Sequence, residues 1–340
     1  MVHPEASHSK VQTFRPPQKK NGHVERVHGR EDKNLKQEQT TDTLLMVSPS
    51  NFKFNEETAK SNVFQKEVKI SNDTALIEFN AAVDTLREHN VRVIVMPSRE
   101  NVETPDSVFP DWFSVHTTDK LRGRVLVLYP MFTESRRLEL QPENLIKHLK
   151  KEGIEINEII DLSPYADAPM FLEGKGSLVL DRENKIIYAA MSERTDPRMV
   201  NIFAEKMKYT PIFFHSFDDN GQLIYHTDVV LSIGSKFAVV ALDTISCKTE
   251  RATILKQLKA SGREIIPVTI EQIKNMAGNM IEVKSTCGKP KIVMSCQAYK
   301  TYTPEQRKTF SKYGEIIALD ITNIETVGGG SCHCMLTEVF

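Results

Sequence analysis

The chain has 340 residues, of which 40% are apolar and 26% are charged, and its formal net charge at pH 7 is −1. These proportions are typical of a globular protein and predict one large domain or two of medium size. A net charge near zero gives no field that would attract nucleic acid, and the chain has no run of about 18 apolar residues that would span a bilayer. We therefore expect neither nucleic acid nor a membrane as a partner.

The N-terminal end of the chain lacks the apolar stretch of a secretory signal. The five cysteines are too few and too scattered for a disulfide framework, so we expect a reduced, cytoplasmic compartment. Residues 1–41 contain almost no aliphatic side chains and cannot bury enough apolar surface to offset the entropy lost on ordering. We predict a disordered tail at 1–41, either inert or serving a partner or targeting receptor, and a folded domain at 42–340.

Short runs rich in β-branched residues recur along the predicted domain and indicate strands. They lie at 91–97, 124–130, 177–181, 185–191, 211–217, 228–234, 237–243, 264–268, 291–296 and 315–321. Several are apolar on both faces, as in a sheet covered by helices. Apolar residues at three- and four-residue spacing predict helices around 76–86, 144–153, 200–208 and 252–262, and the second and last of these end in a glycine suited to a C-cap.

The order of these elements predicts an α/β fold in which strands come in pairs before a helix. The segments 177–191 and 228–242 each contain two strand patterns joined by a short polar turn, which is typical of a hairpin. Strict βαβ winding does not produce such pairs, so we predict a repeated ββα-type unit. No glycine-rich turn joins a strand to a helix N-terminus, which argues against a nucleotide enzyme, and we expect no cofactor.

Ionisable groups among apolar strands are costly unless they are paired or used, so they mark candidate sites. Six side chains of this kind are Asp111, Glu173, Arg194, His226, Asp228 and Cys334. Each has a structural explanation: a turn cap for Asp111, a solvated turn residue for Glu173, a satisfied core histidine for His226 and an ion-pair partner for Arg194. On a strand, residues 226 and 228 would face the same side.

The C-terminal segment has two further cysteine-based interpretations. Cys332, His333 and Cys334 have the form of one corner of a metal site, but the sequence offers no second cluster with ligand spacing, so we expect no metal. One thiol with a histidine and three carboxylates suits thiolate attack on a planar cation, because carboxylates near a thiol make sense chiefly when the substrate brings positive charge. The three glycines at 328–330 would then let the backbone approach the substrate.

These residues stand in motifs that resemble a known family. The segments "GGGSCHCM" at 328–335, "LEG" at 172–174 and "HTD" at 226–228 resemble the guanidine-modifying, or amidinotransferase, superfamily of arginine deiminases, agmatine deiminases and dimethylarginine dimethylaminohydrolases. The sequences at 104–114, 173–197 and 222–245 are most similar to its arginine-deiminase-related branch, which includes citrulline-utilisation hydrolases. The resemblance runs from about residue 44 to residue 340.

The resemblance implies a fold and a set of roles. The fold would be a five-bladed α/β propeller, or pentein, of ββαβ-type repeats around a central polar channel. Cys334 would be the nucleophile, His226 the general acid and base, and Glu173 its partner. The residues around the substrate would be Asp111, Asp228, Arg194, Phe109 and Gly330. The substrate would be a small guanidino or ureido compound, and a homo-oligomer is possible.

Two departures from the family pattern bear on the substrate. Arginine deiminases usually have Glu-Gly-Gly-Asp where this chain has Glu-Gly-Lys-Gly at 173–176, which argues against a strict arginine deiminase. Citrulline-type enzymes tend to have asparagine where this chain has Asp111 and Asp228, which favours a charged guanidinium over a neutral ureido group. Asp106 is an alternative to Asp111, because the motif is one residue shorter here.

We therefore predict a cysteine-dependent hydrolase of linear amidines that works through a covalent S-amidino intermediate. An amidinotransferase with an amine acceptor is one alternative. A non-catalytic binding protein on the same propeller is another, and the cysteine, histidine and acid set argues against it.

Overall fold

The computed structural model describes residues 37–118 and 122–340. Most of the tail predicted at 1–41 lies outside the described residues. Its last five residues do not: Gln39 is buried and its amide donates to the Leu180 carbonyl at 2.8 Å, while the Thr41 hydroxyl donates to the Val339 carbonyl at 2.8 Å. The packed domain therefore already includes residue 39, before the boundary expected at 42. No helix in the described ranges is long and apolar enough to cross a membrane.

The described strands form five sheets of three, and each sheet has the same order of pairing. The first pair of strands in a sheet is antiparallel and the second pair is parallel. The sheets are β15 (Thr337–Glu338), β1 (Thr43–Ser48) and β2 (Arg92–Pro97); β3 (Phe113–Thr117), β4 (Arg124–Leu128) and β5 (Glu158–Asp161); β6 (Val179–Asp181), β7 (Ile186–Ala190) and β8 (Thr210–Phe214); β9 (Leu231–Ile233), β10 (Phe237–Val240) and β11 (Glu264–Pro267); and β12 (Ile281–Lys284), β13 (Pro290–Ser295) and β14 (Glu315–Leu319).

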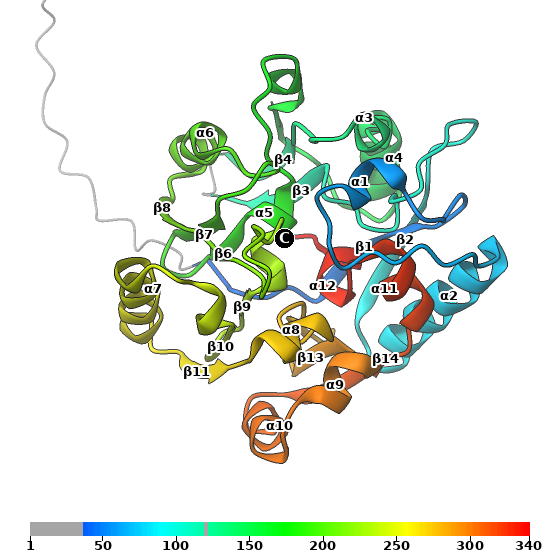
Figure 1. Cartoon of the computed structure of the whole chain (residues 1–340). Coiled ribbons are helices and arrows are strands. Elements are labelled where there is room, and N and C mark those ends of the chain that lie inside the picture. Colours follow the sequence, from blue (N-terminus) through cyan, green and yellow to red (C-terminus); the bar gives the residue numbers. More distant parts are fainter. Residues whose placement is uncertain (1–36, 119–121) are drawn as a thin grey trace, which may run out of the picture. The chain divides into compact units, whose positions relative to one another are not determined.

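Helices make the crossovers that the parallel pairs require. In chain order they are α1 (Glu56–Ala59) and α2 (Asn72–Glu88); α3 (Glu134–Arg137) and α4 (Pro142–Lys151); α6 (Pro197–Met207); α7 (Lys248–Ala260); and α9 (Cys296–Thr301) and α10 (Pro304–Ser311). The longer helices lie at the periphery and the sheets surround a central axis, as in a propeller with five blades (Figure 1). The predicted α/β propeller of hairpin-plus-helix repeats is confirmed.

The C-terminus closes the ring of blades. Strand β15 pairs antiparallel with β1, with Leu44 opposite Glu338 and Leu45 opposite Thr337. The first blade is thus completed by the last strand of the chain. Just before β15, α11 (Thr322–Gly328) and the single turn α12 (Cys332–Met335) bring the glycine and cysteine segment to the axis, where Figure 1 also places α5 (Gly174–Ser177).

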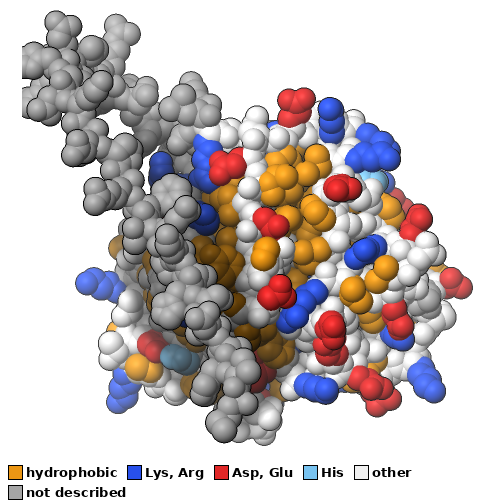
Figure 2. All heavy atoms as spheres, turned by 90° about the horizontal axis from the view of Figure 1, so that it is seen from above, with side chains coloured by type: hydrophobic (Ala, Val, Ile, Leu, Met, Phe, Trp, Pro, Cys, Tyr) orange, Lys and Arg blue, Asp and Glu red, His pale blue; other side chains and the backbone are white. Residues whose placement is uncertain are grey.

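The apolar core is divided among the blades. Among the described residues, four clusters of buried side chains each join neighbouring sheets, and the middle strands β7 and β10 are buried along their whole length. This burial explains the runs that are apolar on both faces. On the face shown in Figure 2, side chains of both charges are interspersed, in keeping with a net charge near zero.

Two local predictions were wrong. The strand expected at 228–234 begins at Leu231, because residues 227–229 form a turn of 3₁₀ helix, η2 (Thr227–Val229), before β9. The turn expected after Glu173 is the short helix α5, which precedes β6. The remaining short helical segments are η1 (Ser163–Asp167), η3 (Leu242–Thr244) and α8 (Ile270–Lys274). Both corrected segments carry predicted site residues.

Candidate active site

A cavity near the axis, here called the thiol cavity, collects most of the predicted site residues. It holds about 270 Å³, including the open space at its mouth. Its lining residues are Thr58, Asn62, Gln65, Asp106, Phe109, Asp111, Arg136, Arg194, Tyr225, His226, Gly328, Gly330 and Cys334. Glu173 and Asp228 lie directly behind this lining, in contact with His226 and Cys334 respectively. The structure therefore brings all eight predicted residues together.

The Cys334 thiol is buried and held by two polar partners. The sulfur accepts a hydrogen bond from the Asn279 side-chain amide at 3.1 Å and donates to Oδ2 of Asp228 at 3.3 Å. Burial, together with the carboxylates of Asp228 and Asp111, raises the pKa of the Cys334 thiol well above its usual range. The sulfur consequently carries its proton in the free protein, which agrees with its role as a donor to Asp228.

Asn279 is a site residue that the sequence did not reveal. Its amide oxygen accepts from the Cys334 backbone N–H at 3.3 Å, and its nitrogen also donates to the Asp228 carbonyl at 3.3 Å. One side chain thus fixes both the backbone and the sulfur of the cysteine. The residue before Asn279 must be a glycine for the chain to pass this close to Val229, because a Cβ on Gly278 would lie 1.9 Å from the Val229 carbonyl oxygen. The sequence around Asn279 contains no motif that would have marked it.

His226 is oriented by Glu173. Its Nε2 lies 2.8 Å from Oε2 of Glu173, and both side chains are almost fully buried. Burial alone would raise the pKa of Glu173, but Arg194, the hydrogen bond with His226 and Arg136 hold it well below its usual range. An ionised carboxylate only accepts hydrogen bonds, so Nε2 of His226 is the donor to Glu173. The pair therefore fixes the orientation of the ring and leaves Nδ1 as its unbonded nitrogen.

The Nδ1 atom of His226 and Oδ1 of Asp228 are buried, have no hydrogen-bond partner and lie 4.0 Å apart. An unpaired buried polar atom is costly, so two of them this close together mark a place where a bound group can complete their hydrogen bonds. The other oxygen of Asp228, Oδ2, receives Nδ1 of His333 at 2.9 Å, and this bond helps to lower the pKa of Asp228 against the effect of burial. Asp228 thus connects the histidine, the thiol and His333.

Gly176, which follows Lys175, leaves space for the His226 ring. A Cβ on Gly176 would lie 2.3 Å from Nδ1 of His226, so no side chain fits at this position while the ring is in place. Gly174 has φ +39°, and a Cβ there would lie 2.3 Å from the Asp111 carbonyl oxygen. The acid that arginine deiminases carry at the position of Gly176 is therefore sterically excluded in this chain.

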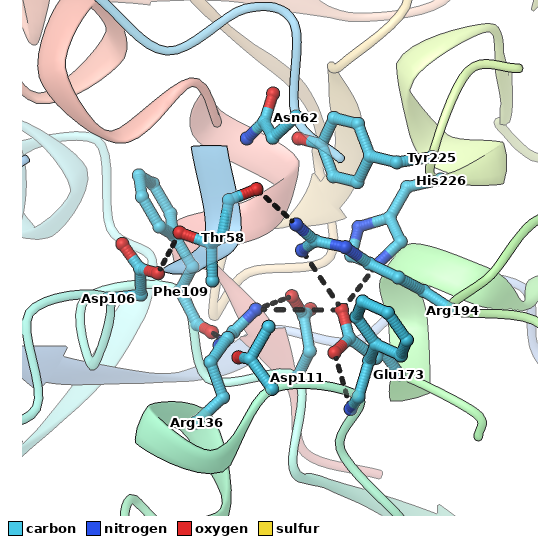
Figure 3. Close-up of polar contacts among 12 residues, drawn as sticks. Thr58, Asn62, Asp106, Phe109, Asp111, Arg136, Glu173, Arg194, Tyr225 and His226 are labelled. Carbon is cyan, nitrogen blue, oxygen red and sulfur yellow. Dashed lines mark hydrogen bonds and ion pairs between the residues drawn. The ribbon is translucent and has the colours of Figure 1, made fainter. Parts of the chain in front are cut away.

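Resident cations already pair the acids of the site (Figure 3). Asp111 places Oδ1 3.0 Å from Nζ of Lys175 and Oδ2 3.2 Å from Nη1 of Arg136. Oε2 of Glu173 lies 3.3 Å from Nη1 of Arg194 and 3.9 Å from Nη1 of Arg136. Arg136 and Arg194 approach the Glu173 carboxylate from different directions. Sequence reasoning missed Arg136, because it lies on a short helix of a different blade with no motif around it.

Arg194 makes contacts beyond Glu173. Its guanidinium donates to the Thr58 carbonyl at 2.9 Å and to the Ser61 hydroxyl at 2.8 Å, and it lies over the Tyr225 ring with 4.8 Å to the centroid. The Tyr225 hydroxyl in turn donates to the Gly329 carbonyl at 2.8 Å. Arg194 therefore joins the segment after β1 to the carboxylate that orients His226.

Asp106, the alternative to Asp111, lines the same cavity. Its Oδ2 accepts from Asn55 at 2.9 Å and from Thr58 at 2.8 Å, while Oδ1 has no partner. Burial raises the pKa of Asp106 despite the opposing charge of Arg136. Both acids are thus at the site, but Asp111 is paired with two cations and Asp106 is held by neutral donors.

The three glycines accommodate an aromatic ring and a helix end. A Cβ on Gly328 or Gly330 would lie 2.4 Å or 3.0 Å from the Phe109 ring, and Gly329 ends α11 with φ +63°. Gly330 also lies against Cys334, because a Cβ on Gly330 would be 3.2 Å from the Cβ of Cys334. The segment therefore packs Phe109 against the turn that carries the thiol.

Cys332 and Cys334 occupy different surroundings although they share α12. Cys332 is fully buried in the apolar cluster between the first and fifth sheets, and burial followed by the Glu325 charge raises its pKa well above the usual range. The neighbouring Ser331 hydroxyl donates to Glu325. Cys334 alone of the two lines the thiol cavity.

A family profile described as N,N dimethylarginine dimethylhydrolase, eukaryotic, matches residues 48–340. The chain belongs to this family. The match begins at the last residue of β1 and covers the rest of the five blades and all the site residues described above, from Asn55 to Cys334. The comparison with curated proteins gave no match.

Solved structures with the same fold include enzymes from bacteria. The N-terminal domain of ArgZ, an arginine dihydrolase of cyanobacteria solved with bound substrate, is 16% identical, with a TM-score of 0.67 over 87% of this chain and 97% of that chain. DDAH from Pseudomonas aeruginosa, solved with citrulline, is 17% identical, with a TM-score of 0.58 over 88% and 99%. Unliganded AgrE is 17% identical, with a TM-score of 0.68 over 88% of this chain and 39% of that chain. This family member therefore has the pentein propeller fold.

Proposed function

We propose that this family member is a cysteine-dependent hydrolase of a guanidino or ureido compound and that it reacts through a covalent intermediate on Cys334. One observation carries the proposal: the thiol and the free ring nitrogen of His226 both face Asp228, at 3.3 Å and 4.0 Å, beside one cavity. Glu173 orients His226 from behind at 2.8 Å. This is a nucleophile, a base and an orienting acid in the arrangement that thiol catalysis needs.

In the first step the Cys334 sulfur bonds to the central carbon of the substrate. The thiol proton is taken up by the His226 and Asp228 pair as the sulfur attacks. His226 then gives a proton from Nδ1 to the departing nitrogen as the carbon–nitrogen bond breaks, and the amine or ammonia leaves. The carbon fragment remains attached to sulfur.

In the second step water attacks the carbon of the S-linked intermediate and Nδ1 of His226 accepts a proton from this water. The carbon–sulfur bond then breaks, the product leaves and Nδ1 returns the proton to the sulfur, which restores the thiol. The same nitrogen therefore acts as acid and then as base, which requires it to be free of other hydrogen bonds, as it is here.

A positively charged substrate would also help to form the thiolate. Burial and the carboxylates of Asp228 and Asp111 raise the pKa of the thiol in the free protein. A guanidinium in the gap beside Asp228 would offset those negative charges, because ion interactions are strong in a site shielded from water. Reactivity of Cys334 would then be highest when the site is filled.

The proposal is tested by incubating the purified full chain with arginine, N-methylated arginines, agmatine and citrulline. Ammonia, methylamines and the carbon products are measured by chromatography. We expect at least one of these compounds to release an amine or ammonia. This release should need no added amine acceptor, because water is the second substrate. Product formed only with an added amine acceptor would identify a transferase, and the absence of product from the whole panel would contradict the proposal.

A further inference from the structure

Lys175 forms an ion pair with an acid of the site, Asp111. It lies between Gly174 and Gly176 on α5, and its side chain is 12% exposed. Its Nζ lies 3.0 Å from Oδ1 of Asp111. The rest of the side chain borders another cavity, here called the second cavity. The second cavity is lined by residues that include Gln39, His116, Tyr129, Arg182, Ser232, Glu282, His333 and Glu338. Lys175 therefore stands between the two cavities.

Lys175 is the cation that serves Asp111 most directly. The other cation on Asp111, Arg136, is shared: it binds Glu139 at 3.0 Å, donates to the Phe109 carbonyl and lies 3.9 Å from Glu173. Among the described residues, the ion pair of Lys175 joins it to Asp111 only. Removing Lys175 would leave Asp111 with part of one divided positive charge.

Only position 175 of this turn can carry such a group. A Cβ at 174 would collide with the Asp111 backbone, and one at 176 would collide with His226, each at 2.3 Å. The side chain at 175 instead lines the second cavity, so its length and charge can vary without displacing His226. The charge at position 175 can therefore be changed by substitution, whereas positions 174 and 176 must remain glycine.

We propose that Lys175 is a specificity-determining residue. Its ammonium compensates Asp111 and thereby weakens the preference of the thiol cavity for a cationic carbon centre over a neutral one of the same shape. The inference rests on the proposed function in one respect, since both require reaction at Cys334.

The reach of the Lys175 charge supports this assignment. It acts on Asp228 and on the thiol as well as on Asp111: it contributes to the lowered pKa of Asp228 and opposes the raised pKa of the Cys334 thiol. A unit charge several ångströms from a bound cation in a partly buried site changes its binding by roughly tenfold or more at an effective dielectric constant of about 20. We therefore expect a change of roughly tenfold in charge preference when the charge at 175 is removed.

The test uses two alkylating reagents that differ in charge and hardly in size, 2-chloroacetamidine, which is a cation, and 2-chloroacetamide, which is neutral. In each, the sulfur attacks the CH₂ carbon, a carbon–sulfur bond forms and chloride leaves. Rates of adduct formation on Cys334 are measured by peptide mass spectrometry for the unmodified chain, Lys175→Gln, Lys175→Met and Lys175→Arg. The matched control is Lys291→Gln, which removes another little-exposed lysine, paired with Glu315 away from both cavities.

We expect the amidine-to-amide rate ratio to rise about tenfold in Lys175→Gln and Lys175→Met, and to stay near the starting value in Lys175→Arg and Lys291→Gln. Circular dichroism identifies any variant that does not fold, and two neutral replacements are made so that one misfolded protein does not decide the result. An unchanged ratio in a folded neutral variant, or an equal rise in Lys175→Arg, overturns the inference. Failure of the unmodified chain to react at Cys334 with either reagent would instead contradict the proposed function.

Discussion

The thiol cavity and the second cavity lie on either side of Lys175, and they differ in how their buried polar groups are satisfied. In the thiol cavity, Nδ1 of His226 and Oδ1 of Asp106 have no partner, and neither does Oδ1 of Asp228 behind the wall. In the second cavity the polar groups form a continuous chain. Arg182 binds Glu338 at 2.8 Å and His116 at 3.0 Å, and His116 continues through Ser114 to the Tyr129 hydroxyl.

The difference separates a site for chemistry from a structural network. A satisfied network stabilises the fold, whereas unpaired buried atoms cost stability and persist when another group is meant to complete them. Among the described residues lining the second cavity, Ser232 alone has a buried side-chain oxygen without a partner. We therefore expect changes in the thiol cavity to alter turnover and changes in the Arg182 network of the second cavity to alter stability.

The largest effect is expected from Cys334→Ser. A hydroxyl is far less nucleophilic than a thiolate at neutral pH, so turnover of the active substrate should fall by roughly 10⁴-fold or more. The melting temperature should change little, because serine can keep the hydrogen bonds with Asn279 and Asp228. Cys332→Ser is the matched control, since that thiol lies in the apolar cluster and should cost stability but spare turnover per folded molecule. Retained activity in Cys334→Ser would break the comparison.

His226→Gln comes next. Glutamine can still donate to Glu173 but cannot carry a proton to the leaving nitrogen, so kcat should fall by roughly 10²–10⁴-fold with a smaller change in KM. Steady-state kinetics at several pH values measure this. A drop below tenfold would show that His226 is a packed core histidine and not the acid and base.

Arg182→Met tests the second cavity. It leaves Glu338 without its buried partner and His116 without its donor, which should cost about 3 kcal/mol of unfolding free energy. Urea denaturation provides the measurement. The control Arg198→Met removes an exposed pair with Asp196 and should be close to neutral. Activity per folded molecule should be retained, and its loss in a folded variant would mean that the two cavities are not separate in role.

Glu325→Gln tests whether an unpaired buried oxygen outside both cavities affects stability alone. Burial raises the pKa of Glu325 from 4.5 to about 7, although a hydrogen bond from Ser331 opposes this, and Oε2 has no partner. Because the folded-state pKa lies above the unfolded value, the favourable contribution is complete below pH 4.5 and is lost as the pH rises through about 7.

At pH 8.5 the Glu325→Gln variant should therefore be more stable than the unmodified chain, by on the order of 2 kcal/mol, with little difference at pH 4.5. Denaturant titrations at the two pH values measure the effect. Glu271→Gln, at an exposed position of α8, should show no such dependence on pH. Equal stability of Glu325→Gln and the unmodified chain at pH 8.5 would contradict the assignment of a buried, reluctant carboxyl.

The repeated unit of paired strands and a helix could be predicted because it is encoded locally, whereas the five-bladed propeller was implied by the family resemblance. Runs such as 185–191 and 237–243 carry their own strand pattern, and the polar turns between paired strands indicate the hairpins. Strands such as β5 (Glu158–Asp161) and β12 (Ile281–Lys284) were missed because they are short and contain charged residues. The false strand start at 228 has a different cause, since the buried pairing of Asp228 with His333 and Cys334 overrides local propensity.

The site was predicted in part for the same reason. His226, Glu173 and Cys334 stand in short recognisable motifs, so their residue types and order were informative. Arg136 and Asn279 come from other blades, and no local pattern marks them. Whether an acid is paired also depends on distant residues, as the contact of Asp111 with Arg136 illustrates. Such contacts arise only when the blades pack.

The central claim is that Cys334 forms a covalent bond with the substrate carbon. The most direct measurement is rapid acid quenching during turnover of a substrate from the panel, followed by digestion and mass spectrometry of the C-terminal peptide. We predict an added mass equal to the carbon fragment on Cys334, which disappears as substrate is consumed and is absent from Cys334→Ser. Product formation at full rate with no adduct at any quench time, or with the adduct on Cys332, would contradict the account.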